Sequence, residues 1–341
     1  MRKILIIVSL SVALALAAGA CGGSNIGGND VPLSNLPGAA MEDGENAGAP
    51  NNSPSVMREN LPAADPTGEE TGSSANFDAS KNISILARED GSGTKSAFME
   101  IIGLKGKADP INVIIQTGTA GILTEVKSNP AAIAYESLGY VTSDVKMLKV
   151  DGVEATIPNI KNGTYKISRP LSVVYKEDAL NNEVNKAFYT FLQSKDAQEI
   201  ISEEGYVPII DNSTAYMING SLSGSIDISG STSLQPLMTE LAEVFEGLQP
   251  NISVTVSGGG SGTGYKNADE GVSEFGMISE EFSLEKAPSC TDYVVCKDGI
   301  AVIVHKDNPL GDVTMEQLKN IYDIEAESDA ITKWDELISI R

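Results

Sequence analysis

Positive charge is scarce in this sequence. Only 24 of its 341 residues are Lys or Arg, against 47 Asp or Glu, and the formal net charge is −23. A chain with this charge repels the phosphates of nucleic acids, which argues against a nucleic-acid partner. Any site for an anion must therefore use local hydrogen-bond donors and helix dipoles instead of a basic surface.

Histidine and cysteine are also rare. The single histidine, His305, follows the apolar run 300–304 and leaves no second imidazole for a metal cluster or a proton relay, so we expect no metal and no cofactor. Besides Cys21 the chain contains Cys290 and Cys296. In an oxidising compartment these two either form a disulfide or remain buried thiols, and the sequence leaves both alternatives open.

The motifs of common hydrolases are missing. No Gly-x-Ser-x-Gly elbow surrounds Ser92 or Ser261, no P-loop Gly-Lys-Ser/Thr follows the glycines, and metal-ligand spacing is absent. We therefore expect a binding protein and not an enzyme such as a phosphatase or an esterase.

The first residues have the pattern of an export signal. Arg2 and Lys3 precede the apolar run 4–17, which is too short and wrongly flanked to span a membrane, so residues 1–20 are predicted to be a signal peptide. Residues 16–20 and Cys21 resemble the lipobox of bacterial lipoproteins, which implies a lipid on Cys21; ordinary cleavage after 18–20 is the alternative. Residues 21–81 are polar and lack a period, which predicts a disordered tether.

From residue 82 onward short apolar runs alternate with amphipathic segments, which is typical of an α/β fold. The predicted strands are 83–87, 111–115, 131–135, 171–175, 225–228, 252–256, 275–278 and 300–304. The predicted helices are 92–102, 119–127, 184–192, 197–204, 234–248 and 314–322.

Two distant segments have the same Gly-Ser-Gly-Thr sequence. One is 91–94, close after Arg88, and the other is 260–263; each comes soon after a predicted strand. In the first, the hydroxyls and amides of Ser92, Gly93 and Thr94 are predicted to lie at a helix N-terminus, where free N–H groups and the dipole favour an anion. The repetition predicts two lobes that close on one small anion.

Taken together, the motifs from residue 82 onward resemble the PstS-type phosphate-binding proteins of bacterial ABC importers. The segments that carry the resemblance are 88–94, 129–135, 169–171, 229–236, 258–264, 275–279, 298–301, 308–310 and 334–337. The resemblance implies a two-lobe periplasmic-binding-protein fold of type II, in which each lobe is a mixed sheet flanked by helices and the ligand lies in the cleft. Lobe II is then 82–168 and 297–341, and lobe I is 169–211 and 225–296.

The order of these motifs differs from that of the family. The Ser-Gly-Ser-Thr strand begins the fold in the family, whereas here the second half precedes the first. The simplest interpretation is a circular permutation in which residues 212–224 join the usual termini. The alternative is a truncated tandem, in which each half pairs with a neighbouring copy.

The resemblance also implies a set of phosphate ligands. Lobe I would contribute Thr232, Ser233, Ser261, Ser279 and Glu280, and lobe II would contribute Arg88, Asp90, Ser92, Gly93 and Thr94. A carboxylate at Glu280 would accept the proton of monohydrogen phosphate and repel sulfate, although the family often has Asp there and Glu280 pointing to solvent is the alternative. Asp90 would either contact the anion or hold Arg88 in place.

The function implied is capture of inorganic phosphate outside the cytoplasm for the permease subunits of an ABC importer. The protein would be a monomer that is attached to the outer face of the cell membrane only by its lipid. The alternatives are a binder of another oxyanion, such as sulfate or molybdate, and a non-transporting phosphate sensor; a phosphatase is the weakest of them.

Overall fold

A computed structural model describes residues 77–338 of the chain. The predicted signal peptide, Cys21 and most of the predicted tether lie outside the described residues. Within the described range, no helix is both long enough and apolar enough to cross a membrane.

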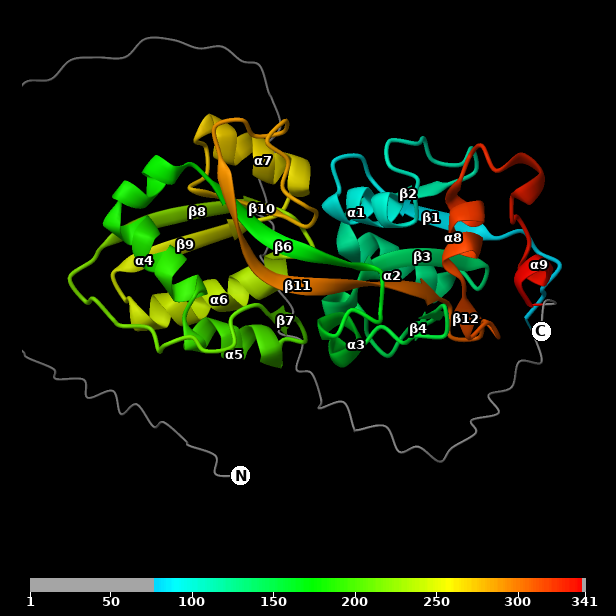
Figure 1. Cartoon of the computed structure of the whole chain (residues 1–341), viewed down its shortest axis with the longest axis horizontal. Helices are drawn as coiled ribbons and strands as arrows, with labels where there is room; N and C mark the ends of the chain where they lie inside the picture. Colours follow the sequence, from blue (N-terminus) through cyan, green and yellow to red (C-terminus); the bar gives the residue numbers. More distant parts are fainter. Residues whose placement is uncertain (1–76, 339–341) are drawn as a thin grey trace, which may run out of the picture. The chain divides into compact units, whose positions relative to one another are not determined.

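The backbone of the fold is one ten-stranded mixed sheet (Figure 1). The path of the sheet is β2-β1-β3-β11-β6-β10-β8-β9, and β4 and β7 pair with β11 beside it. Its strands are β1 (Ser84–Arg88), β2 (Ile114–Gln116), β3 (Ala132–Ser137), β4 (Lys146–Met147), β6 (Ser168–Tyr175), β7 (Val207–Pro208), β8 (Gly224–Gly230), β9 (Ile252–Ser257), β10 (Phe275–Ile278) and β11 (Thr291–Val304). A separate pair joins β5 (Lys149–Val150) to β12 (Asp312–Val313).

The direction of the strands divides this sheet into two parts. Strands β2, β1 and β3 are parallel to one another, and so are β10, β8 and β9. The long strands β6 and β11 are antiparallel and join the two parallel groups through β3 and β10. Figure 1 shows β6 and β11 running from one group into the other.

Two main hydrophobic cores lie on either side of these crossing strands. The core of lobe II is drawn mainly from 83–167 and 300–337 and includes Trp334 and the stacked rings of Phe98 and Tyr135, 4.0 Å apart. The core of lobe I is drawn from 171–206 and 226–296, with a smaller cluster around Tyr265. The residue limits of the lobes stay a prediction.

Helices cover both parallel groups. They are α1 (Gly93–Ile101), α2 (Gly118–Ser128), α3 (Ile157–Lys161), α4 (Glu183–Leu192), α5 (Lys195–Glu203), α6 (Gln235–Leu248), α7 (Ser261–Glu270), α8 (Met315–Tyr322) and α9 (Trp334–Ile338). The predicted α/β class and the six predicted helices are confirmed to within a few residues. Helix α7 and most of β11 were not predicted, and β2 begins later than expected, because Ile111 lies in an exposed turn.

The first and last described segments are bonded to each other. The Ile83 N–H donates to the Thr332 carbonyl at 2.8 Å, and the Trp334 N–H donates to the Lys81 carbonyl at 3.2 Å. The ring of Phe77 packs edge-on against Trp334, with centroids 5.7 Å apart. Residues 77–81, which the sequence placed at the end of the tether, therefore pack on lobe II.

The alternative of a disulfide between Cys290 and Cys296 is wrong. Both thiols are free and buried. Cys296 lies within β11 and Cys290 immediately before it, and an extended strand advances by about 3.3 Å per residue, so the backbone separates the two side chains by far more than a disulfide spans.

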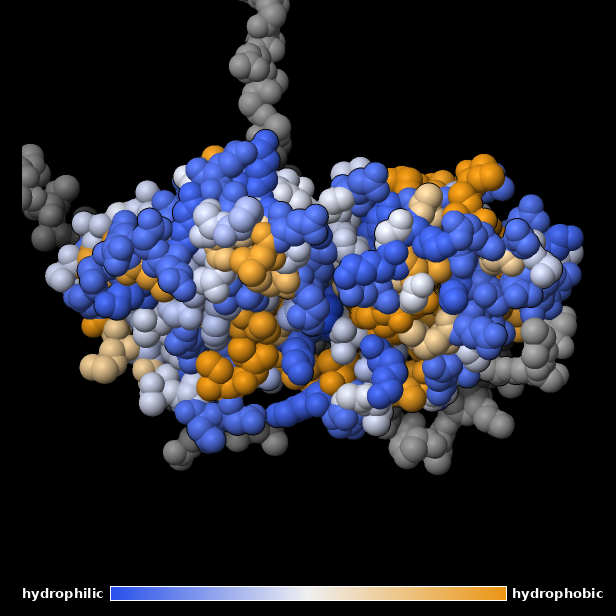
Figure 2. All heavy atoms as spheres, turned by 45° about the horizontal axis from the view of Figure 1, so that its top comes forward, coloured by the Kyte–Doolittle hydropathy of each residue, from blue (hydrophilic) through white to orange (hydrophobic). Residues whose placement is uncertain are grey.

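Hydrophilic side chains dominate the exposed surface. Figure 2 shows them over most of the visible face of both lobes, with smaller apolar areas between them.

Candidate functional site

The candidate site lies where strands of both lobes end. Strands β1, β8 and β9 each run at their carboxyl ends into a polar loop and then a helix, namely α1, α6 and α7. In open α/β sheets, ligands bind outside the carboxyl ends of such strands. Hydroxyl groups gather here because serine and threonine are favoured at helix starts: Ser92 Oγ accepts the Lys95 N–H, and Ser231 Oγ accepts the N–H groups of Ser233 and Leu234.

Hydroxyls from the two lobes meet at this point. Thr94 Oγ1 of lobe II lies 2.9 Å from Ser233 Oγ of lobe I. Ser261 Oγ lies 3.3 Å from Ser279 Oγ and accepts the Ser279 N–H at 3.0 Å. All four residues are buried. The structure therefore brings together hydroxyls that are far apart in the sequence.

Arg88 is the cation of the site and is almost fully buried. Its Nη2 donates to Thr232 Oγ1 of lobe I at 2.9 Å. Its Nε and Nη2 donate to the two carboxylate oxygens of Glu89 at 2.9 and 3.0 Å, which is the bidentate geometry of a strong ion pair. On the opposite side, Nη1 donates to Thr119 Oγ1 and Glu136 Oε2, each at 3.3 Å.

Gly93 is the point of closest approach between the two glycine-rich segments. A Cβ at Gly93 would lie against Ser261 Oγ and only 2.7 Å from Ser279 Oγ. Beside it, the Gly262 N–H donates to the Gly91 carbonyl at 3.0 Å. A side chain at residue 93 would hold the two segments apart, so the absence of one is what lets the two Gly-Ser-Gly-Thr segments touch.

Two predicted site residues have partners that were not expected. The Asp90 side chain is fully exposed and is ion-paired to Lys95 at 2.8 Å, so the expectation that it holds Arg88 is wrong. Glu89 does this instead, because the turn at 89–92, closed by a Ser92 N–H to Glu89 carbonyl bond, folds its side chain back. Glu280 is buried and does not point to solvent, but its carboxylate is ion-paired to Lys286 at 2.7 Å.

A second buried ion pair joins the crossing strands to the site. Arg169 on β6 donates through Nη2 to Asp298 Oδ2 on β11 at 3.1 Å and through Nη1 to the Ser279 carbonyl at 2.9 Å. The same Asp298 oxygen accepts the hydroxyl of Ser137, at the end of β3, at 2.8 Å. Arg169 and Asp298 therefore connect a site residue of lobe I with the end of a lobe II strand.

The sequence prediction missed Glu89, Thr119, Glu136 and Asp298 as neighbours of the site. One signal was available, because Glu136 directly follows the buried strand segment 132–135. A charged residue at the carboxyl end of a buried strand is costly unless it is paired, and this position predicts a nearby cation.

The carboxyl groups around Arg88 have different environments. Partial burial works against ionisation of Glu89, but the bonds from Arg88 outweigh it and hold its pKa below the ordinary value. Complete burial raises the pKa of Glu136, with Arg88 opposing the shift. Burial likewise raises the pKa of Asp298, with Arg169 opposing it.

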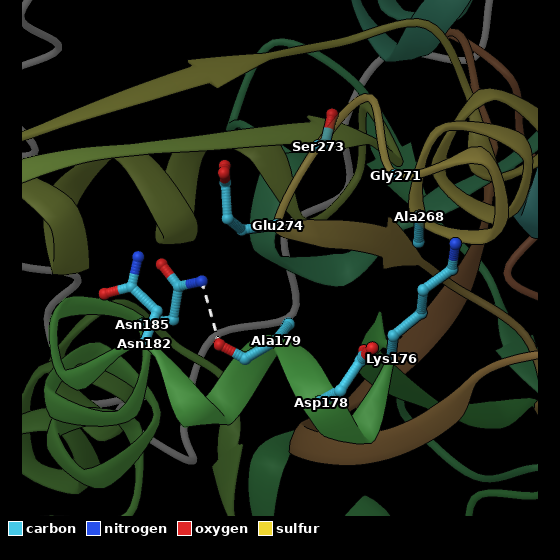
Figure 3. Close-up of a pocket in the computed structure, with 9 residues that line it drawn as sticks. All are labelled: Lys176, Asp178, Ala179, Asn182, Asn185, Ala268, Gly271, Ser273 and Glu274. Atoms are coloured by element: carbon cyan, nitrogen blue, oxygen red, sulfur yellow. Dashed lines mark hydrogen bonds between the residues drawn. The ribbon is translucent and has the colours of Figure 1, made fainter.

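Other places in the described part of the chain offer less chemistry. Among residues 77–338, no group of three or more His, Cys, Asp and Glu side chains is arranged to hold a metal ion. One open cavity of about 230 Å³ lies in lobe I near Lys176, Asn185 and Glu274 (Figure 3). Two of its polar groups bond within the fold: Asn185 Nδ2 donates to the Ala179 carbonyl, and Glu274 Oε2 accepts the Asp227 N–H.

Comparison with known proteins places this fold and site in a class. Residues 70–196 and 218–340 match the family model described as the PBP superfamily domain. A Phosphate-binding protein PstS 2 from Streptococcus agalactiae is 37% identical over 264 residues, which cover 75% of this chain and 87% of that protein. The PstS 2 protein of Streptococcus pneumoniae serotype 4 is 33% identical over 266 residues, which cover 76% of this chain and 89% of that protein.

A solved structure gives the same result. The crystal structure of a phosphate ABC transporter, phosphate-binding protein from S. pneumoniae TIGR4 aligns with a TM-score of 0.61 and 32% identity, covering 75% of this chain and 99% of that one. The chain therefore belongs to the PBP superfamily and, within it, to the family of PstS phosphate-binding proteins. The predicted two-lobe binding-protein fold is confirmed.

Proposed function

We propose that this protein binds inorganic phosphate between its two lobes and delivers it to the permease subunits of an ABC importer. One observation carries the proposal: a buried guanidinium and hydroxyls from both lobes converge within hydrogen-bonding distance of one another. The PstS 2 relatives and the solved structure from S. pneumoniae, which are named as phosphate-binding, support the choice of ligand.

In this proposal the donors that now bond to one another turn to the anion. Arg88, Thr94, Thr232, Ser233, Ser261 and Ser279 supply donors, and Ser92 and Gly93 place the first turn of α1 at the anion. Glu280, directly after Ser279, would leave its ion pair with Lys286 and accept a hydrogen bond from the hydroxyl group of monohydrogen phosphate. Asp90 has an outer role, in which it restrains Lys95 beside the site.

A calorimetric titration of the purified protein with phosphate and with sulfate tests this function. We expect phosphate to bind at least about a hundredfold more tightly than sulfate, because a buried carboxylate accepts a hydrogen bond from the first and meets only lone pairs on the second. Equal affinities for phosphate and sulfate would indicate a general oxyanion binder instead. Hydrolysis of a phosphate ester above background would contradict a purely binding role.

The cellular setting belongs to the same proposal. PstS-type substrate-binding proteins work outside the cytoplasm, and we place this protein there as a monomer that is held to the outer face of the membrane by a lipid on Cys21. The resemblance of 16–20 to a lipobox supports this placement. Metabolic labelling with a fatty-acid analogue, compared with the Cys21→Ser variant, tests it.

We also propose that the two halves of the chain are circularly permuted relative to PstS proteins such as that of Bacillus subtilis, whereas the PstS 2 relatives, which align over 264 and 266 residues, share the order of this chain. The family model matches two segments that meet near 197–217, and the Bacillus subtilis PstS alignment covers 142 residues, or 41% of this chain and 46% of that protein. The pairing of β11 with both β3 and β6 within one chain argues against a truncated tandem, and the bonds between 81–83 and 332–334 supply a short path for joining the halves.

Reversing the order tests the permutation. A chain that begins at residue 225, continues through 338 and a short glycine-serine linker to 77, and ends at 211 should fold as a monomer and bind phosphate within about threefold of the parent affinity. The parent chain with the same linker added after residue 338 is the control. An aggregated product, or a dimer in which halves exchange, would contradict the proposal.

A further inference from the structure

Glu136 is a buried carboxyl group that the proposed function leaves without a role. It lies at the carboxyl end of β3 and has no exposed surface. Its Oε2 accepts Arg88 Nη1 at 3.3 Å, and its Oε1 accepts the Thr119 hydroxyl at 3.3 Å and the Ser137 N–H at 2.8 Å. It therefore contacts Nη1 of the site arginine, whereas Thr232 contacts Nη2.

The charges around Glu136 do not balance when all of them are ionised. Arg88 on β1 and Arg169 on β6 are the cations that act on it, and Thr119 on α2 and the Ser137 N–H are its neutral donors. These two guanidinium groups are shared with Glu89, which is partly exposed, and with buried Asp298, so the cluster holds two cations and three carboxylates. A bound phosphate dianion adds further negative charge close to Arg88 and would compete for the same cation.

A proton on Glu136 would relieve this imbalance without moving Arg88. We propose that Glu136 is a positioning residue for Arg88 and that its carboxylate takes up a proton from solvent when phosphate binds. The inference rests on the proposed phosphate site. The proton moves from water to the carboxylate, which becomes a neutral acid, and Arg88 then directs its charge to the anion. The raised pKa of buried Glu136 supports this assignment.

The sign of the pH dependence follows from this exchange. Below the pKa of Glu136 the carboxyl group is already neutral, so it does not repel the bound phosphate. Above that pKa the carboxylate repels the anion, so affinity falls as pH rises. The Glu136→Gln variant keeps a neutral acceptor of similar size at every pH, and its affinity should lack this fall.

Calorimetry of the wild type and Glu136→Gln in buffers of different ionisation enthalpy, from about pH 5 to about pH 8, tests the inference. Phosphate's own titration is common to both proteins and cancels in the comparison. We expect the wild type to take up more protons per phosphate than the variant, by up to about one. At the highest pH the variant should bind on the order of tenfold more tightly, and the two affinities should converge at low pH.

Matched variants separate positioning from charge. Glu100→Gln removes an exposed carboxylate that is paired to Lys105 and should leave the proton count unchanged. Thr119→Val removes a donor that stabilises the ionised form, so the pH range of proton uptake should move upward while the net charge stays constant. This variant tests the inference even if Glu136→Gln does not fold.

The possible failures are distinct. If wild type and Glu136→Gln bind phosphate with equal proton uptake at every pH, the inference is overturned and the proposed function stands. If the wild type does not bind phosphate at all, both are overturned.

Discussion

Replacing Arg88 with methionine is expected to weaken phosphate binding by about a hundredfold to a thousandfold. The guanidinium offers charge-assisted hydrogen bonds, each worth about 1.5–3 kcal/mol, and two of them near the lower end of that range account for a loss of this size. Its position cannot be filled by a neighbour, because among residues 77–338 it is the cation that contacts Thr232 and the Glu136 carboxylate together. Calorimetric titration of the variant with phosphate measures the loss.

The control for Arg88→Met is Lys105→Met. Lys105 is an exposed cation paired to Glu100, so its removal changes the net charge by the same amount without touching the site. We expect phosphate affinity to stay within about twofold, because exposed charges at a distance are screened by salt. An Arg88→Met protein that remains folded and binds phosphate as well as Lys105→Met does would refute the placement of the site.

Replacing Arg169 with methionine is expected to lower the free energy of unfolding by about 3–5 kcal/mol at neutral pH. The change leaves Asp298, which is fully buried, without its cationic partner. The loss should be smaller in acid: without Arg169 the pKa of Asp298 rises further, and a protonated carboxyl no longer carries an uncompensated charge. Fluorescence of Trp334, the single tryptophan of the chain, during urea unfolding measures both effects.

The double variant Arg169→Met, Asp298→Asn makes this prediction specific. Removing both charges should restore a large part of the lost stability, because no buried charge remains unpaired. As a control, Lys297→Met removes an exposed cation beside Asp298 on β11 and should lower the free energy of unfolding by less than about 0.5 kcal/mol. Equal losses in Arg169→Met and in the double variant would show that the arginine acts through packing instead.

The helices and strands that the sequence predicted well are those with a clear apolar period and a capped start. Helix α6 buries Leu237, Met238, Leu241 and Phe245 along one face, which is a strong helical pattern. Helix α8 begins with a capping box of Thr314 and Gln317, which is readable from the sequence. In both, local chemistry and tertiary packing favour the same structure.

Helix α7 was missed because its local chemistry opposes it. Its first residues include Gly262 and Gly264, and glycine costs about 1 kcal/mol in a helix interior. The helix forms because it packs unusually close to β10: a Cβ at Gly264 would lie against the Met277 carbonyl. This closeness places Ser261 at the site, and it depends on the backbone of another element, which no local pattern reveals.

Strand β11 was predicted only over its last, uniformly apolar part. Its first half pairs with β6 and its second half with β3, so the chain passes from one core to the other and its burial pattern changes on the way. At fourteen residues it is also far longer than a usual strand. A sequence pattern that assumes one regular spacing of apolar residues along the whole strand does not predict such an element.

The sequence predicted which residues form the site better than it predicted which residues bond to Arg88. Arg88 and the hydroxyl residues lie together as the two Gly-Ser-Gly-Thr segments indicated. The expectation that Asp90 holds Arg88 was wrong: Glu89 pairs with Arg88, and Asp90 pairs with Lys95. Glu136 and Asp298 lie on other strands, so only the paired sheet shows that they approach the arginines.

The clasp between 81–83 and 332–334 has a mechanical consequence. A pull on the N-terminal side of residue 77 meets the hydrogen bonds to Thr332 and Lys81 and the Phe77 ring contact before it reaches β1. These contacts all belong to lobe II, and lobe I is connected to it through β6, β11 and the chain around β7. If the chain is held at the surface as we propose, a force applied at residue 77 would load the contacts of lobe II first, and lobe I would feel it only through the strands that join the two lobes.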